Sequence, residues 1–215
     1  APMPDALASQ MQAMHDVLDA FSVPTFKKEG FEADDLVATI AEKAKKDAEV
    51  FILSGDLDNL QLVDDKVKLY TLGKSIKEAV IYDPAKVVER FGVEPKQMND
   101  FKALTGDTSD NIPGVPGIGK TTAAQLIGQY GSIKGLYQEL ATDTAVLKPK
   151  VKMALKENKD KALLSLDLVK TDKNVDIEFN LENCRFKTFD EQKVKAIFNE
   201  LGFNSLLDRL PTIIF

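Results

Sequence analysis

The sequence predicts an α/β core followed by a mostly helical region. Short apolar runs rich in strand-forming residues are concentrated in the first half of the chain, at residues 49–53, 67–71 and 79–82. Beyond about residue 83, apolar residues recur at the three- and four-residue spacing of helices. The 215 residues are enough for one large domain or two small ones. We therefore expect an α/β front half and a helical back half, with the boundary between residues 83 and 106.

The first segment of the chain is a predicted amphipathic helix over residues 3–21, because apolar side chains recur there at helical spacing. Residues 22–26 are a short strand candidate. Pro24 interrupts this candidate, since proline cannot donate a hydrogen bond to a strand ladder.

Three carboxylates crowd the start of the next helix, which is predicted from about residue 33. They belong to Glu32, Asp34 and Asp35. Acidic residues in a first turn complement the helix dipole, which is the simpler interpretation. Three carboxylates this close together also repel one another, and a cation would relieve that repulsion. The group is therefore a candidate for a metal site.

A second acidic group follows a compact apolar run at residues 49–53, where Ser54 and Gly55 lead into Asp56 and Asp58. An apolar run that ends in polar residues predicts a buried parallel strand with polar groups at its carboxyl end. In open α/β sheets, ligands bind at that end. The alternative is a solvated turn, because Asp and Asn are ordinary turn residues.

The remaining elements follow from the same spacing rules. The strands predicted at 67–71 and 79–82 are separated by a turn that contains Gly73 and Lys74. Residues 175–179 alternate between polar and apolar, which fits either a strand or an extended loop. Helical spacing between Gly- or Pro-marked turns predicts helices near residues 84–91, 95–105, 120–130, 133–141, 149–157, 159–170 and 190–201.

The third acidic group, Asp107 and Asp110, stands immediately before a Gly/Pro-rich turn. That turn runs from Pro113 to Gly119 and leads directly into a predicted helix. Carboxylates suit a hard divalent cation. A glycine-rich turn that opens a helix presents backbone N–H groups to phosphate. A metal site beside a phosphate cradle suggests phosphodiester chemistry.

No histidine or cysteine accompanies the three acidic groups. Oxygen-only ligands select Mg²⁺ or Mn²⁺ over Zn²⁺. Paired acidic sites of this kind fit two metal ions about 3.5–4 Å apart, which hold the scissile phosphate and activate water. One ion would lower the pKa of the attacking water, and the other would stabilise the leaving 3′ oxygen. A Ser-His-Asp or Cys-His nucleophile is not supported, because His15 is the only histidine.

The composition is consistent with this chemistry. The net charge of −6 argues against a bulk basic nucleic-acid binder, but the acids are concentrated in a few groups that cations would neutralise. Six lysines between residues 148 and 161 indicate either a solvated helix face or a contact with phosphates. Cys184 is the only cysteine, which fits a reducing cytoplasm. No apolar stretch is long enough to predict a membrane span, and no secretory signal pattern is seen.

Together, the three acidic groups and the Gly/Pro turn resemble the 5′-nuclease domain of bacterial DNA polymerase I, in the flap endonuclease superfamily. The resemblance covers about Pro2 to Pro211, and the third motif is the most specific. The segments that carry it are Phe31-Glu32-Ala33-Asp34-Asp35, Leu53-Ser54-Gly55-Asp56-Leu57-Asp58 and the run from Leu104 to Gly119.

The resemblance implies an α/β fold: a PIN-like 5′-nuclease core with a mostly parallel sheet, followed by a helix-hairpin-helix subdomain. It places the core at residues 1–83, the DNA-binding helical subdomain at 84–185 and a C-terminal helical segment at 186–215. It implies a metal-dependent 5′→3′ exonuclease and flap endonuclease. The expected partners are DNA with 5′ flaps, nicks or RNA primers, and a linked polymerase domain.

The resemblance also assigns site residues. Glu32, Asp34 and Asp35 are expected in the first metal region. The second region takes Asp56, Asp58, Asp107 and Asp110, some through water; Asp56, Asp58 and Asp110 are the expected catalytic residues. Two or more Mg²⁺ or Mn²⁺ ions are implied, with K⁺ at the hairpin. The hairpin residues expected to grip duplex phosphates are Gly114, Gly117, Gly119, Lys120 and Thr121.

The chain departs from the family pattern in two ways. Family members have a lysine one position later than Lys120. The family also begins with a segment, bearing further metal-binding aspartates, that this chain does not have. We therefore expect the chain to be a fragment that needs the missing N-terminal segment for full activity. The alternative is a non-catalytic module that binds DNA structures.

Overall fold

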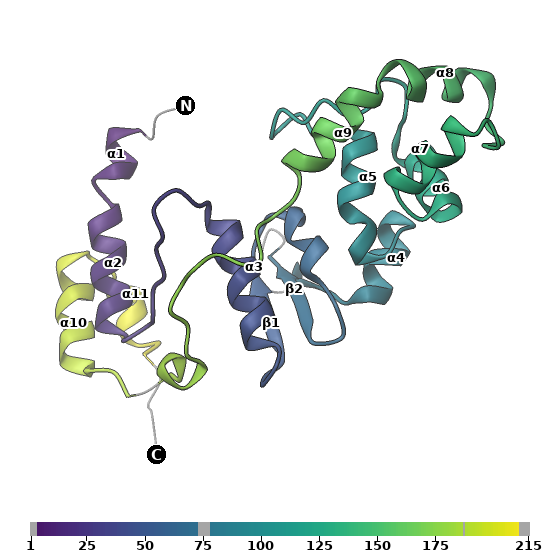
Figure 1. Ribbon diagram of the computed structural model, residues 1–215. Coiled ribbons are helices and arrows are strands. Elements are labelled where there is room, and N and C mark those ends of the chain that lie inside the picture. Colours follow the sequence, from purple (N-terminus) through teal and green to yellow (C-terminus); the bar gives the residue numbers. More distant parts are fainter. Residues whose placement is uncertain (1–3, 73–77, 187, 211–215) are drawn as a thin grey trace. The chain divides into compact units, whose positions relative to one another are not determined.

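The computed structural model describes residues 4–72, 78–186 and 188–210 (Figure 1). Its contacts divide the chain into two compact units. The larger unit comprises Gly30–Asp176, and the smaller one combines Ala1–Glu29 with Ile177–Phe215. The boundaries predicted at 83/84 and 185/186 lie inside these units and stay a prediction.

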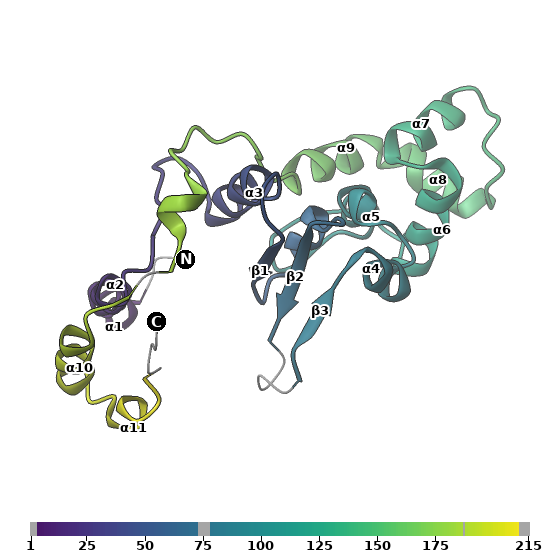
Figure 2. The same ribbon diagram turned by 90° about the horizontal axis from the view of Figure 1, so that it is seen from below.

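A three-stranded sheet lies in the larger unit, in the order β1 (Val50–Leu53), β2 (Val67–Thr71) and β3 (Val80–Tyr82) (Figure 2). β1 and β2 are parallel, and β2 and β3 are antiparallel. The expectation of a mostly parallel sheet is therefore corrected, since the described sheet is mixed. A parallel return needs a crossover of about a dozen residues or more, whereas the short link between β2 and β3 allows only an antiparallel return. The predicted turn at Gly73 and Lys74 lies outside the described residues.

Each strand buries alternate side chains on one face of the sheet, as strand geometry requires. Ile52, Val67, Leu69 and Tyr82 are buried there. On β1, the neighbours Phe51 and Leu53 are 50% and 66% exposed. The prediction of a fully buried strand at 49–53 is thus wrong for one face, because β1 is an edge strand that meets the core through alternate residues only.

Helices cover one face of this sheet and continue away from it (Figures 1 and 2). Their core is continuous from Ala38 through Leu69 to Ala162. The α-helices are α3 (Ala33–Ala44), α4 (Pro84–Phe91), α5 (Met98–Thr105), α6 (Lys120–Tyr130), α7 (Ile133–Ala141), α8 (Pro149–Glu157) and α9 (Lys159–Leu168). Two 3₁₀ helices are η1 (Leu57–Leu62) and η3 (Pro95–Gln97).

α5 is the helix that positions the site, because it packs against α6, α9 and η1. Phe101 and Leu104 are buried and fix the helix in the core. Gly106 ends it with φ +72°, a conformation that glycine adopts without a steric penalty. Lys102 lies between these anchors, on the turn next to the acidic loop.

The smaller unit brings together the two ends of the chain. It contains α1 (Asp5–Ala8), α2 (Met11–Ala20), η4 (Leu181–Cys184), α10 (Glu191–Glu200) and α11 (Asn204–Leu207). α2 packs against α10. Phe21 contacts the rings of Phe189 and Phe198, with ring centroids 4.8 and 5.8 Å apart.

The helix predicted over residues 3–21 is divided into α1 and α2. Ser9 and Gln10 separate the two helices, and both of their side chains donate to the carbonyl of Ala6, over 3.1 and 2.9 Å. Such side-chain bonds compete with the helical ladder, which explains the interruption.

The two weakest strand candidates form no strand. Residues 22–26 are irregular. Residues 175–179 are an extended loop, where the N–H of Val175 donates to the Thr39 hydroxyl over 3.0 Å instead of pairing with a strand. Among the described residues, no helix has both the length and the apolar character needed to cross a membrane.

Candidate metal centre and nucleic-acid interface

The first acidic group begins α3, as predicted. The N–H of Glu32, which caps the helix, donates to Oδ2 of Asp35 over 3.2 Å. Oδ1 of Asp35 accepts from the N–H of Asp172 over 2.8 Å, so protein groups engage both oxygens of this carboxylate. Asp34 accepts a 3.3 Å hydrogen bond from the buried amide of Asn59, which links α3 to η1.

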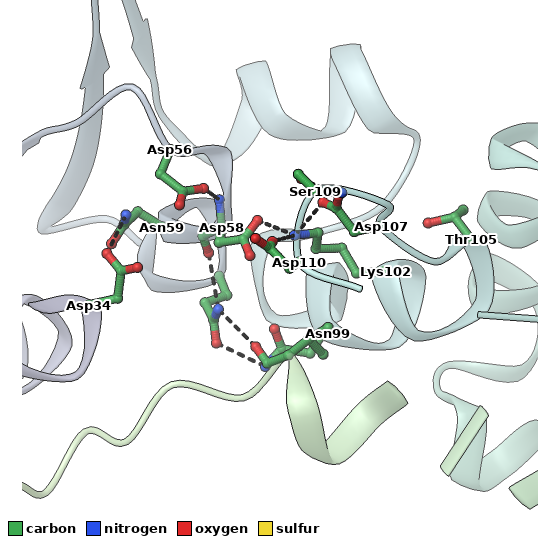
Figure 3. Close-up of polar contacts among 12 residues, drawn as sticks. Asp34, Asp56, Asp58, Asn59, Asn99, Lys102, Thr105, Asp107, Ser109 and Asp110 are labelled. Atoms are coloured by element: carbon green, nitrogen blue, oxygen red, sulfur yellow. Dashed lines mark hydrogen bonds and ion pairs between the residues drawn. The ribbon is translucent and has the colours of Figure 1, made fainter. Parts of the chain in front are cut away.

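The second group lies at the carboxyl end of β1, also as predicted. Asp56 caps η1, and its Oδ1 accepts from the N–H of Asp58 over 2.8 Å. The N–H of Asp56 donates to the Ser54 hydroxyl over 3.0 Å. These two local bonds fix the turn, and Asp58 faces α5 (Figure 3).

The third group lies on a short closed loop after α5. Asp107 and Ile112 exchange two backbone hydrogen bonds of 3.0 and 2.7 Å, which close the loop around Asp110. Ser109 donates its N–H to Oδ1 of Asp107 over 2.9 Å, and its hydroxyl contacts the same oxygen. The loop therefore holds Asp107 in one orientation.

The fold brings these three groups to one place. Asp58, Asp107 and Asp110 each offer a carboxylate oxygen within 4.8 Å of the other two (Figure 3). A cavity of about 360 Å³ adjoins this cluster. Of the seven predicted metal ligands, six line the cavity: Glu32, Asp34, Asp35, Asp56, Asp58 and Asp110. The donor set is oxygen only, which fits a hard divalent cation such as Mg²⁺ or Mn²⁺.

Lys102 is a site residue that sequence reasoning missed. Its Nζ contacts Oδ1 of Asp58 closely and lies 2.9 Å from Oδ2 of Asp107 and 3.8 Å from Oδ2 of Asp110 (Figure 3). The side chain is only 13% exposed. One signal could have revealed it: a single lysine stands on the last turn of the helix that leads into the third acidic group.

The charges around Asp58 do not fully stabilise its ionised form. Burial raises the pKa of Asp58, the carboxylates of Asp56 and Asp110 add to this effect, and Lys102 opposes it. Hydrogen bonds from Ser109 and Lys102 lower the pKa of Asp107 to about 2. Burial would lower the pKa of Lys102, but its hydrogen bonds to Asp58 and Asp107 outweigh burial and raise it. A further cation would therefore favour the ionised form of Asp58.

A distant segment completes the cavity, and sequence reasoning missed it as well. Residues 168–171, at the end of α9, line the cavity with Gln61. The Gln61 amide donates to the carbonyls of Asp58 and Val169 over 3.0 and 3.2 Å. Its oxygen accepts from Asn99 and from the N–H of Thr171, over 3.0 and 3.3 Å. Asn99, Val169 and Thr171 are 38, 108 and 110 residues away from Gln61, so no local pattern indicated them.

The predicted hairpin lies between α5 and α6. Gly117 has φ +86°, and Gly117, Gly119, Lys120 and Thr121 are exposed. Gly119 precedes α6, and no side chain of the described residues caps the first N–H groups of that helix. Uncapped N–H groups at a helix start suit phosphate oxygens. Gly114 is different: it is buried, and its N–H donates to Ser165, so this N–H is not available to a phosphate.

Comparison with known families decides the assignment. Residues 1–92 match the family described as "5′-3′ exonuclease, N-terminal resolvase-like domain". Residues 93–192 match "5′-3′ exonuclease, C-terminal SAM fold". The chain belongs to the 5′-3′ exonuclease family. The predicted family and fold class are confirmed, and the family boundary at 92/93 falls between α4 and η3.

The curated relatives of this chain are much longer proteins. DNA polymerase I of Bacillus subtilis (strain 168) is 40% identical over 208 residues, which cover 96% of this chain and 23% of that protein. DNA polymerase I of Mycobacterium tuberculosis (strain ATCC 25618 / H37Rv) is 36% identical over 208 residues, with the same coverage. The chain thus spans about a quarter of the length of these relatives.

Solved structures share the exonuclease fold at lower identity. The T5 D15 protein co-crystallised with metal ions is 23% identical, with a TM-score of 0.63 over 96% of this chain and 72% of that one. The catalytic core of Rad2 in complex with DNA substrate is 16% identical, with a TM-score of 0.66 over 100% of this chain and 72% of that one.

Proposed function

We propose that this chain is the 5′-nuclease part of a DNA polymerase I, which hydrolyses DNA phosphodiesters at 5′ ends and flaps. The observation that carries the proposal is the convergence of three acidic groups on one cavity, the last of which is followed in the chain by an exposed hairpin. Membership of the 5′-3′ exonuclease family supports it. The proposed substrates are DNA with 5′ flaps, nicks or RNA primers, met in the cytoplasm by a protein that also carries a polymerase domain.

The carboxylates would hold two or more divalent ions, Mg²⁺ or Mn²⁺. Asp58, Asp107 and Asp110 would share one ion, because their oxygens already lie together. Glu32, Asp34 and Asp35 line the same cavity and would form the first metal region, whereas Asp56 would serve the second region with the three aspartates that share an ion, some through water. When bound, such ions lower the pKa of an attacking water and neutralise the leaving oxygen. Asp56, Asp58 and Asp110 are the proposed catalytic residues.

The hairpin would hold the duplex beside this cavity. Its exposed backbone at Gly117 and Gly119, with Lys120 and Thr121 at the start of α6, suits phosphate oxygens. K⁺ is the proposed monovalent ion at this turn. Gly114 is not part of the proposed contact, because its N–H donates to the Ser165 hydroxyl.

The test uses the protein expressed from its complete gene, a labelled 5′-flap substrate and Mg²⁺. Asp110→Asn and Asp56→Asn are expected to lower cleavage by orders of magnitude while duplex binding, measured by fluorescence anisotropy, stays largely intact. Asp208→Asn, which changes an exposed acid of the smaller unit, is the matched control. Near-normal turnover of the two site variants would contradict the assignment.

One observation favours a second candidate, a non-catalytic module that binds DNA structures. Lys102 already supplies a positive charge to Asp58, Asp107 and Asp110, so the cluster can exist as an internal ion-pair network. Titration calorimetry separates the candidates. Mn²⁺ binding that the double variant Asp56→Ala/Asp58→Ala abolishes supports the nuclease, and absence of binding supports the DNA-binding module.

A further inference from the structure

The position of Lys102 points to a role beyond charge balance. We propose that the Lys102 ammonium is a built-in counter-ion of the metal centre, which a divalent ion must displace in order to bind. The inference rests on the proposed function, because it presumes that the carboxylates take a metal. It concerns how this chain sets its own affinity for that metal.

The ammonium and a metal ion would use the same three carboxylates. Nζ contacts the carboxylates of Asp58, Asp107 and Asp110, the residues whose oxygens converge within 4.8 Å. Mg²⁺ takes its oxygen ligands at about 2.0–2.1 Å, so an ion held by these three carboxylates would need oxygens that the ammonium now faces. The two cations therefore compete for the same carboxylates, among which Figure 3 shows the ammonium of Lys102.

At Asp107, the lysine and a metal ion would compete for one oxygen atom, Oδ2. Ser109 engages its Oδ1 through both the backbone N–H and the hydroxyl. Oδ2 is the oxygen that faces the cluster, and Nζ of Lys102 lies 2.9 Å from it. Because the Ser109 contacts hold the orientation of the carboxylate, a metal would have to take Oδ2 from the lysine.

Charge prevents the two cations from sharing the cluster at close range. A divalent ion and an ammonium in contact repel strongly, and the low exposure of Lys102 limits screening by water. The lysine can leave without a change in the fold. Phe101 and Leu104 anchor α5 in the core, while the four-carbon stem of a lysine has rotatable bonds that can carry the ammonium away.

Two consequences follow for the protein. Without metal, the ammonium relieves the repulsion among the three carboxylates and keeps the loop of Asp107 and Asp110 closed against η1. With metal, part of the binding free energy is used to break the contacts of Lys102. Removal of the ammonium should therefore tighten metal binding and weaken the metal-free protein.

The experiment is Mn²⁺ titration calorimetry at pH 7.5, with thermal unfolding in chelator and in saturating Mn²⁺, on the protein expressed from its complete gene. The test variants are Lys102→Met and Lys102→Gln, and Lys102→Arg keeps the charge. Lys45→Met is the matched control, because Lys45 also bridges two carboxylates, Glu42 at 2.8 Å and Asp64 at 2.9 Å, away from the cavity.

We expect Lys102→Met and Lys102→Gln to bind Mn²⁺ about tenfold or more tightly than wild type, because no charge-assisted hydrogen bonds remain to be broken. In chelator both should melt below wild type, and saturating Mn²⁺ should remove the difference. Lys102→Arg and Lys45→Met should bind Mn²⁺ no more tightly than wild type. Unchanged or weaker binding by both neutral variants, with normal wild-type binding, would overturn the counter-ion role alone. No binding by any variant or by wild type would overturn the metal centre itself.

Discussion

The backbone N–H of Gly114 donates a 3.1 Å hydrogen bond to the hydroxyl oxygen of Ser165, and both residues are buried. This bond ties the loop after α5 to α9. Ser165→Ala would leave the N–H without a partner, so the free energy of unfolding should fall by about 1–3 kcal/mol in urea denaturation. Ser205→Ala, at an exposed position, should change it by less than about 0.5 kcal/mol. Equal losses of unfolding free energy in the two variants would show that the buried hydrogen bond does not stabilise the fold.

Gly114 also has no room for a side chain. A Cβ built on it would lie 2.4 Å from the backbone nitrogen of Gly106, and its φ is +61°. Gly114→Ala should therefore lower the free energy of unfolding by about 2–5 kcal/mol, through both the clash and the backbone strain.

Gly128 offers the matched control for this substitution. It lies within α6, and a Cβ there would meet nothing within 4 Å. Gly128→Ala should raise the free energy of unfolding by up to about 1 kcal/mol, because alanine favours the helix. If both alanine variants were equally stable, the close approach of Gly114 and Gly106 would be contradicted.

Asp100 should make the folded protein more stable at low pH than at neutral pH. Burial raises the pKa of Asp100, although its Oδ1 accepts from the N–H of Ile133 over 2.8 Å. The folded protein therefore holds this proton more tightly than the unfolded chain does. The contribution is fully present below pH 3.8 and is lost as the pH rises through the raised pKa. Urea denaturation from pH 3 to pH 7 should show wild type losing stability relative to Asp100→Asn.

Asp64→Asn provides a comparison of opposite sign. Burial would raise the pKa of Asp64, but the hydrogen bond from Lys45 and two backbone N–H groups outweigh it and lower the pKa. This contribution is present above pH 3.8 and is lost as the pH falls through the lowered pKa. From pH 3 to pH 7, wild type should therefore gain stability relative to Asp64→Asn and lose stability relative to Asp100→Asn. A gain relative to both variants would contradict the burial argument for Asp100.

Lys120 should affect DNA binding without selecting a sequence. Lys120→Ala is expected to weaken duplex binding equally for different sequences and to reduce the slope of log Kd against log salt by about 1. Fluorescence anisotropy over a salt series measures both. Lys96→Ala, at an exposed lysine paired with Glu94 over 2.7 Å, should leave the slope unchanged. An unchanged slope for Lys120→Ala would remove this residue from the proposed contact.

Local chemistry explains what could be predicted from the sequence. The positions of the acids after β1 and at the start of α3 could be predicted, because strand ends and helix starts have short-range sequence patterns. The ends of α4 and α5 are marked by Gly92 and Gly106, whose φ values are both +72°. That the three acidic groups share one cavity was predicted through the family motif.

Long-range contacts explain what could not be predicted. Lys102 and Asp58 are 44 residues apart, and Gln61 and Val169 are 108 apart. No periodicity relates such pairs, because the packing of α5 against both η1 and α9 brings them together. The antiparallel pairing of β3 follows from its short connection to β2. The interruption at Ser9 follows from a side-chain hydrogen bond to the carbonyl of Ala6.

The joining of both chain ends in the smaller unit imposes an order on folding during synthesis. All of Gly30–Asp176 leaves the ribosome before α10 exists, so the larger unit can complete its core first. Until α10 is made, the apolar side of α2 stays uncovered, because Val194 and Phe198, which pack in the same hydrophobic cluster as α2, belong to α10. A premature stop between Asp176 and α10 would therefore release a chain in which the apolar side of α2 stays uncovered, and such a chain is a substrate for chaperones and proteases.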